Sequence, residues 1–176
     1  MGLTLERINA MTPQAFVGAL GGVFEHSPWI AELAFAARPF GSVVALHEAM
    51  VRAVKQALRE RQLALLNAHP ELAGKEAQAG TLTSSSTAEQ ADAGLNALNR
   101  AEIQTLARWN REYREKFGFP FVIAVRRHTK ASIFSEIERR LANDTETELD
   151  AGLEQVFDIT RLRLEALFAA QPGSAA

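Results

Sequence analysis

The sequence predicts an all-α protein, a compact single-domain bundle of about seven to nine helices with a short extended segment near residues 119–125. A chain of 176 residues with 47% hydrophobic positions can bury one sizeable core. Alanine is frequent, long runs of β-branched residues are rare, and proline and glycine divide the chain into stretches with helical spacing. We expect the domain to span residues 1–170 and residues 171–176 to form a flexible tail.

The first half is predicted to hold three helices, each opened by a hydroxyl residue. Thr12 and Ser27 each precede a proline, which suits the first helical position, and Ser42 can cap a long third helix. Glycines or prolines follow the first two stretches and end them. The expected helices are 13–20, 28–37 and 42–68, the last with a kink near Glu60.

The second half contains the one long irregular connection expected, over residues 73–87. A helix is predicted from about Ala88 to Phe117, divisible at Asn99, with Gly118 ending it. Residues 119–125 read like a strand, but the sequence offers no second strand to pair with it, so we expect a buried extended segment. Thr129 and Thr145 are the expected caps of helices 130–142 and 146–170, with Glu148 completing a capping box for the last one.

Composition and motifs exclude several function classes. The chain has no cysteine, so it can form no disulfide, thiolate nucleophile or cysteine-ligated metal site. It carries no phosphate-binding glycine loop and no metal-binding histidine motif, and we expect no metal. A net charge of -2 without any basic run predicts no binding to nucleic acid or to membranes. The first nine residues alternate apolar and charged side chains, unlike a signal peptide, so we expect a cytoplasmic protein.

Among the four histidines, His69 is the strongest candidate for chemistry. Pro70 prevents a helix from continuing through His69, so the imidazole is presented at a helix exit. The alternative is a histidine whose positive charge suits the C-terminal end of a helix dipole, and the spacing alone leaves both open. For His26 and His47 we expect surface or packing roles.

Two other groups of polar residues have both a structural and a functional interpretation. Glu89 and Gln90 follow Ser86 and Thr87 by three residues, which matches capping boxes, but the same helix start can hold a polar ligand. Arg161 and Arg163 lie two positions apart on the last helix and therefore point in nearly opposite directions. One of them should face inward, and composition does not decide which.

Five blocks in order resemble one enzyme family. The most specific are His-Pro-Glu-Leu-Ala at residues 69–73 and Phe-Gly-Phe-Pro-Phe-Val at residues 117–122. Together with residues 21–32, 38–40 and 86–95 they are similar to 2-oxo-4-hydroxy-4-carboxy-5-ureidoimidazoline (OHCU) decarboxylase. The resemblance extends from about Asn9 to Leu164. Glu71 stands where the family more often has aspartate.

The resemblance implies a site as well as a fold. It implies that His69, Glu89 and Arg163 are catalytic, with Arg161 the fallback for the arginine. The family is all-helical, works without a cofactor and is commonly a homodimer. The substrate-binding residues that it implies are Pro70, Ser86, Thr87, Ala88, Gln90, Phe121, Val122, Ile123, Ala124 and Val125.

The implied reaction is the decarboxylation of OHCU to (S)-allantoin in urate degradation, with no cofactor and with His69 as general acid and base. The small-molecule substrate is then the expected binding partner. Two alternatives stay open: a decarboxylase of a related ureido acid, and a non-catalytic helical module that binds a partner through residues 73–87.

Overall fold

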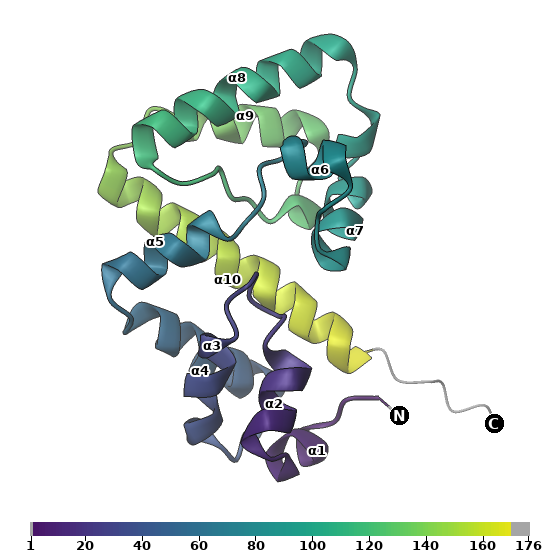
Figure 1. The fold of residues 1–176 in the computed structure, drawn as a ribbon, viewed down its shortest axis with the longest axis vertical. Coiled ribbons are helices and arrows are strands. Elements are labelled where there is room, and N and C mark those ends of the chain that lie inside the picture. The colour runs from purple at the N-terminus through teal and green to yellow at the C-terminus, as the bar shows by residue number, and fades with distance from the viewer. Residues whose placement is uncertain (1, 170–176) are drawn as a thin grey trace, which may run out of the picture. The chain divides into compact units, whose positions relative to one another are not determined.

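The computed structural model describes residues 2–169, which form ten α-helices, three 3₁₀ helices and no β-strand (Figure 1). The all-α class is therefore confirmed, and two short helices that were not expected, of six and five residues, lie at Leu5–Ala10 and Lys75–Ala79. The expected tail, residues 171–176, lies outside the described residues. No helix among residues 2–169 combines the length and apolarity needed to cross a lipid bilayer.

The described chain divides into two compact units, which we treat separately. The first contains the residues up to Leu65 and those from Phe157 onward, and the second contains Leu66–Val156. Helices α5 (Arg59–Asn67) and α10 (Thr145–Ala169) contribute residues to both. The further elements of the first unit are α1 (Leu5–Ala10), α2 (Pro13–Leu20), α3 (Trp29–Ala34), the 3₁₀ helix η1 (Phe35–Ala37) and α4 (Val43–Lys55).

Side-chain caps fix the helix starts of the first unit. The hydroxyl oxygens of Thr4, Thr12 and Ser42 each accept a hydrogen bond from the backbone N–H three residues on, at 3.2, 3.3 and 3.0 Å. The starts expected after Thr12 and Ser42 are confirmed. The helices that follow these caps bury apolar side chains completely, and they contribute Ile8, Phe16, Leu20, Leu46, Met50 and Val54 to the core.

Two details of the first unit differ from expectation. Pro28 itself occupies the N-cap position of α3, so no side chain caps that helix and the role expected for Ser27 is wrong. The long helix 42–68 is two helices, because α4 ends at Lys55 and α5 begins at Arg59, close to the expected kink. Leu58 lies in this break and is 75% exposed.

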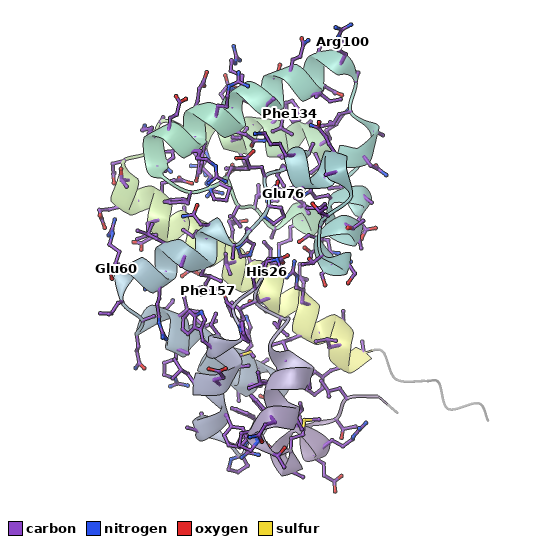
Figure 2. All side chains as sticks on the ribbon, viewed as in Figure 1. His26, Glu60, Glu76, Arg100, Phe134 and Phe157 are labelled. Carbon is purple, nitrogen blue, oxygen red and sulfur yellow. The ribbon has the colours of Figure 1, made fainter. Side chains whose placement is uncertain are left out.

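In the second unit, helices α8 (Arg100–Phe117) and α9 (Lys130–Arg140) lie beside each other (Figure 1). Asn99 and Glu102 form a reciprocal capping box at the start of α8, and Gly118 ends it in the left-handed conformation with φ 81°, as predicted. Trp109 of α8 meets Phe134 of α9 edge to face, with ring centroids 5.5 Å apart. Figure 2 labels Phe134 on α9. The elements of this unit are α6 (Lys75–Ala79), α7 (Ser84–Asp92), η2 (Leu95–Ala97), α8 (Arg100–Phe117), η3 (Val125–Arg127), α9 (Lys130–Arg140) and the start of α10.

Residues 73–87 are not one irregular connection, so that prediction is wrong. The stretch contains α6, and α7 begins at Ser84 rather than at Ala88. The reason is that Thr83 caps α7: its hydroxyl accepts from the N–H of Ser86 at 3.2 Å. The serines read as loop residues are thus the first turn of a helix, where small polar side chains are well tolerated.

The start of α10 also differs from the prediction. Asp144, not Thr145, caps it, because its carboxylate accepts from the backbone N–H of Thr147 at 2.9 Å. This hydrogen bond and one from the Thr147 hydroxyl lower the pKa of Asp144. Glu148 takes no part in a capping box and is instead fully buried.

The strand-like segment is buried without a sheet, as expected. Residues 119–124 form neither helix nor strand, and the chain then turns through η3. The rings of Phe119 and Phe121 pack against Tyr113 of α8, with centroid distances of 5.9 and 5.4 Å. Aromatic packing therefore covers the segment in place of a neighbouring strand.

We predict that His47 makes the stability of the fold depend on pH. Its Nε2 lies 3.0 Å from Oγ1 of Thr160, and burial followed by the charge of Arg161 lowers its pKa. The unfolded histidine takes up a proton first, near its ordinary pKa of 6.5, so its contribution is present above that pH and is lost as pH falls below it. Urea unfolding at pH 8.0 and pH 5.5 should show a smaller loss of stability for His47→Gln than for the unmodified protein. Equal losses would contradict this role.

Candidate functional site

His69 lies two residues beyond the last residue of α5. Only 6% of its surface is exposed, and its backbone N–H donates to the carbonyl of Leu66 at 3.1 Å. A histidine that only complemented a helix dipole would gain most from solvent contact for its charge. Its burial therefore favours the functional interpretation of the His-Pro motif over the dipole interpretation.

The loop that carries His69 is tied on both sides to the end of α8. Arg114 of α8 donates to Oε1 of Glu71 at 2.8 Å and to Oδ1 of Asn67 at 3.2 Å. Asn67 in turn donates to the carbonyl of Gly118 at 3.1 Å. These contacts span the residues before and after the histidine, so they restrict where its ring can lie.

Two buried amides hold the continuation of this loop. Asn110 of α8 donates to the carbonyl of Leu72 at 3.1 Å, and the N–H of Ala73 donates to Oε1 of Gln90 at 2.9 Å. Ala73 has a left-handed φ of 47°, which an alanine adopts only when its surroundings impose it. Sequence reasoning did not single out Asn110. The available signal was a polar residue on the buried face of α8, in line with Leu106 and Tyr113.

Helix α7 presents its predicted site residues on two faces. Ser86, Glu89 and Gln90 are buried, whereas Thr87 and Ala88 are exposed. Because α7 begins at Ser84, Glu89 and Gln90 lie well inside it, and the interpretation of both as capping residues is wrong. A carboxylate and an amide thus lie buried at adjacent positions of α7.

The extended segment lies next to α7 within the second unit. Helix α7 packs against η3, and Asp92 of α7 forms an ion pair with Arg126 of η3 at 3.3 Å. All five predicted substrate-binding residues of the segment, 121–125, are at most 5% exposed. Within residues 2–169, the N–H and C=O of Ile123 have no hydrogen-bond partner.

Unpartnered backbone groups at a buried residue are unusual, since nearly all such groups are hydrogen-bonded in folded proteins. They mark a place where a ligand with one donor and one acceptor would be stabilised. A cavity of about 540 Å³ beside α7, lined partly by Thr87 and Gln90, is otherwise mostly apolar, and Ile123 is not among its lining residues. In the described part of the chain, no three histidine or carboxylate side chains gather as metal ligands.

The two arginines of α10 behave differently. Arg161 is exposed and pairs with Asp158 at 3.4 Å, whereas Arg163 is only 7% exposed. Arg163 donates to Oε2 of Glu25 at 2.7 Å and to the carbonyl of Val23 at 3.3 Å. Arg163 is therefore the arginine that faces inward. Glu25, which is 2% exposed, was missed because it lies in a loop where no periodicity marks it.

Most of the predicted site thus falls in one unit. The second unit joins the His69 loop to α7 through Gln90 and joins α7 to the extended segment through η3. Arg163 belongs to the first unit. The roles of these residues in catalysis and binding stay predictions.

Comparison with known proteins gives consistent matches. The family model described as OHCU decarboxylase matches residues 9–165. A Haloferax volcanii protein named 2-oxo-4-hydroxy-4-carboxy-5-ureidoimidazoline decarboxylase is 45% identical over 169 residues, which cover 96% of this chain and 98% of that protein. The uric acid degradation bifunctional protein PucL of Bacillus subtilis is 40% identical over 92% of this chain, which corresponds to 32% of its own length.

A solved structure is similar as well. The crystal structure of (S)-allantoin synthase superposes with a TM-score of 0.73 at 28% identity over 93% of this chain. The chain spans about half of that protein, 54% of its length.

We predict that removing one partner of the buried Arg163–Glu25 pair lowers the free energy of unfolding. Arg163→Met leaves the Glu25 carboxylate buried without its cation, and such a loss typically costs about 3–5 kcal/mol. The double variant Arg163→Met with Glu25→Leu should recover most of that stability, because both charges of the pair are then removed. Urea unfolding of both variants measures the difference, and a double variant no more stable than the single one would contradict the prediction.

Proposed function

The chain belongs to the OHCU decarboxylase family of carboxy-lyases, and on that premise we propose that it converts OHCU to (S)-allantoin in urate degradation. The observation that carries the proposal is the near full-length match to a relative of that name, at 45% identity. The buried histidine, carboxylate and amide of the second unit supply side chains suited to this chemistry.

The substrate brings its own electron sink. The carbon that loses CO₂ carries a hydroxyl group and adjoins a C=N bond, so the electron pair of the breaking C–C bond moves toward the ring nitrogen. Once the ring nitrogen has taken up a proton from water, the product of this step is an enol, which must lose its hydroxyl proton and gain a proton on the neighbouring carbon. We therefore expect no cofactor to be needed.

His69 is the group proposed to move these protons. As a neutral imidazole it accepts the hydroxyl proton, and as imidazolium it delivers a proton to the neighbouring carbon from one face. Such acid-base assistance is typically worth ~10²- to 10⁴-fold in rate. The hydrogen bonds from Arg114 to Asn67 and Glu71 support the proposal, because delivery of the proton to one face requires an imidazole ring with a fixed position.

Glu89 and Gln90 are proposed to bind the ureido group and the ring. The Gln90 oxygen already accepts from Ala73, which leaves its Nε2 to donate to a substrate carbonyl. Glu89, an acceptor when ionised, is then the partner for substrate N–H groups. We therefore propose that Gln90 donates to the substrate and that Glu89 accepts from it.

The peptide groups of Ile123 are proposed to hold the ring plane. A cyclic ureide presents an N–H and a C=O side by side, which complements one backbone C=O and one N–H. Both groups of Ile123 are without a partner in the described chain, and a ligand that pairs with them removes the cost of their burial.

Arg163 is proposed to orient the substrate or to stabilise charge that develops on the ring oxygen. A tight clamp on the departing carboxylate would favour the ground state over a transition state in which that charge leaves, which would slow the reaction. We also propose a homodimer, which the family resemblance implies, and a location in the cytoplasm.

The first test of this proposal is stereochemical. OHCU generated in place from urate by urate oxidase and the following hydrolase decays without help to racemic allantoin, so circular dichroism reports any enzymatic contribution. We expect the protein to accelerate the decay and to give the S enantiomer. Racemic product at an unchanged rate would defeat the proposed function.

A variant of the histidine tests its role within that reaction. We expect His69→Asn to lower the rate by about 10²- to 10⁴-fold and to reduce the enantiomeric excess. His128→Asn is the matched control, since Nδ1 of this histidine lies 3.2 Å from Oγ of Ser132 and His128 has no role in the proposed reaction. Full activity of His69→Asn would exclude His69 as the general acid and base.

Ligand-dependent melting separates the enzyme from a non-catalytic binding module. An allantoin-shaped pocket gains stability by mass action, so saturating (S)-allantoin should raise the melting temperature. A module that recognises a protein partner through residues 73–87 has no reason to respond. A melting temperature independent of (S)-allantoin up to millimolar concentrations would favour the module.

A further inference from the structure

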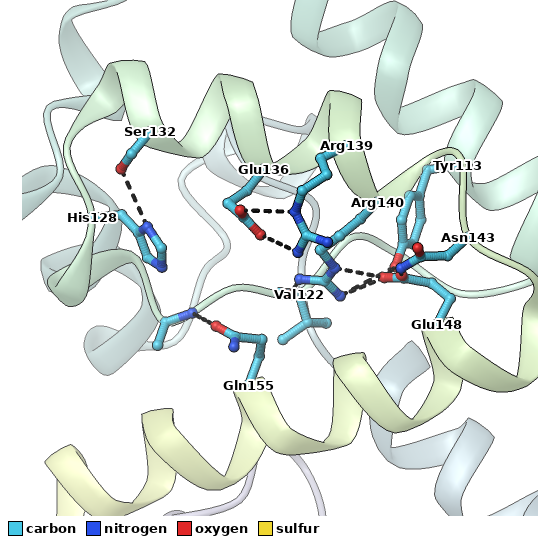
Figure 3. Close-up of polar contacts among 11 residues, drawn as sticks. Tyr113, Val122, His128, Ser132, Glu136, Arg139, Arg140, Asn143, Glu148 and Gln155 are labelled. Carbon is cyan, nitrogen blue, oxygen red and sulfur yellow. Dashed lines mark hydrogen bonds and ion pairs between the residues drawn. The ribbon is translucent and has the colours of Figure 1, made fainter.

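Two side chains hold the peptide groups on either side of Ile123. Arg140, the last residue of α9, donates from Nη1 to the carbonyl of Val122 at 2.8 Å. Gln155 of α10 accepts from the N–H of Ala124 at 3.0 Å (Figure 3). We propose that Arg140 and Gln155 are positioning residues that turn the Ile123 peptide groups toward the substrate, an inference that rests on the proposed function.

Backbone geometry supplies the first argument. In an extended chain, the C=O of one residue and the N–H two residues later point to the same edge, and the groups of the residue between them point to the other edge. Val122 and Ala124 are two residues apart, and the Val122 C=O and the Ala124 N–H are both hydrogen-bonded. Fixing one edge therefore directs the N–H and C=O of Ile123 to the opposite edge, where the described chain offers them no partner.

The second argument is that Arg140 cannot move independently. Its Nε donates to Oε1 of Glu148 at 2.8 Å, and the Tyr113 hydroxyl donates to the same oxygen. Asn143 donates to Oε2 of Glu148 at 2.8 Å, and the guanidinium lies over the Phe121 ring, 4.6 Å from its centroid. Figure 3 shows Arg140, Tyr113 and Asn143 converging on the Glu148 carboxylate. The donor that meets Val122 is thus held in one place.

The third argument concerns the cost of this arrangement. Arg140 is 2% exposed and Glu148 is 0% exposed, and taking two charges out of water is expensive. Apolar side chains of similar volume often stabilise a core equally well or better. An apolar replacement, however, cannot donate a hydrogen bond to a carbonyl in a segment without a neighbouring strand. The ion pair therefore provides a fixed hydrogen-bond donor for the Val122 carbonyl, which an apolar core would lack.

The Tyr113 hydroxyl of this network should stay protonated over the whole working pH range. Burial, together with the hydrogen bond to Glu148, raises the pKa of Tyr113 far above its ordinary value of 10. The tyrosine therefore remains a donor, and the carboxylate remains satisfied. The function inferred for the network is a constant orientation of the backbone, not a response to pH.

Variants at Gln155 give the sharper test, because this side chain is only partly buried. Gln155→Met removes the acceptor for the Ala124 N–H at similar volume, and Gln155→Glu keeps an acceptor. We expect Gln155→Met to raise KM about tenfold, with kcat little changed, if the ring contacts are equally strong in the ground and transition states. The enantiomeric excess should also fall, and Gln155→Glu should restore both quantities.

Arg140→Lys tests the other end of the segment. A lysine keeps the charge beside Glu148 but lacks the fork that reaches Glu148 and Val122 together, so we expect the same rise in KM. Arg139→Met is the matched control on α9, since Arg139 is exposed and pairs with Glu136. If Arg140→Lys does not fold, the two Gln155 variants decide the matter.

Folded Gln155→Met with the KM and the enantiomeric excess of the unmodified protein would overturn the inference, even if its melting temperature were lower. A rise in KM shared equally by Gln155→Met and Gln155→Glu would also overturn it, because the acceptor would then be irrelevant. Failure of the proposed function looks different: the unmodified protein itself would give racemic allantoin.

Discussion

A buried extended segment without a neighbouring strand has no ladder to satisfy its backbone hydrogen bonds, and this constraint organises the second unit. Residues 119–125 are too apolar to remain at the surface, so helices must supply partners for their polar groups. Arg140 and Gln155 do so at Val122 and Ala124. The buried Glu148 is then needed to balance the arginine. The Ile123 peptide groups, which have no partner within residues 2–169, are the ones that the proposed ligand would meet.

The same reasoning explains the loop around His69. Loops usually lie at the surface because water satisfies their backbone, yet this one includes a buried histidine and a left-handed Ala73. Side chains from two helices replace water: Asn110 binds the Leu72 carbonyl, and Gln90 binds the Ala73 N–H. Side-chain partners for irregular backbone therefore hold both parts of the candidate site, and such partners leave little freedom for reorganisation during a reaction.

Local sequence signals predicted those parts of the fold that depend on neighbouring residues. Caps and terminators such as Thr12 and Gly118 act within one turn, so their roles could be predicted without the structure. The expectation failed at Thr83, where serines that favour loops follow a capping threonine and start α7. Contacts between residues distant in sequence could not be predicted. Arg163 and Glu25 are separated by 138 positions, and no periodicity connects them. The site residues came from the family resemblance, which carries tertiary information that spacing lacks.

Each unit contains a buried arginine that binds both a glutamate and a backbone carbonyl. Arg140 pairs with Glu148 and Val122, and Arg163 pairs with Glu25 and Val23. An ion pair alone would be a costly way to fill a core, and its net contribution to stability is often close to zero. A fixed planar donor, in contrast, orients whatever it binds. For a substrate that supplies its own electron sink, the main demand on the protein is orientation, so the expense of buried arginines is consistent with the proposed chemistry.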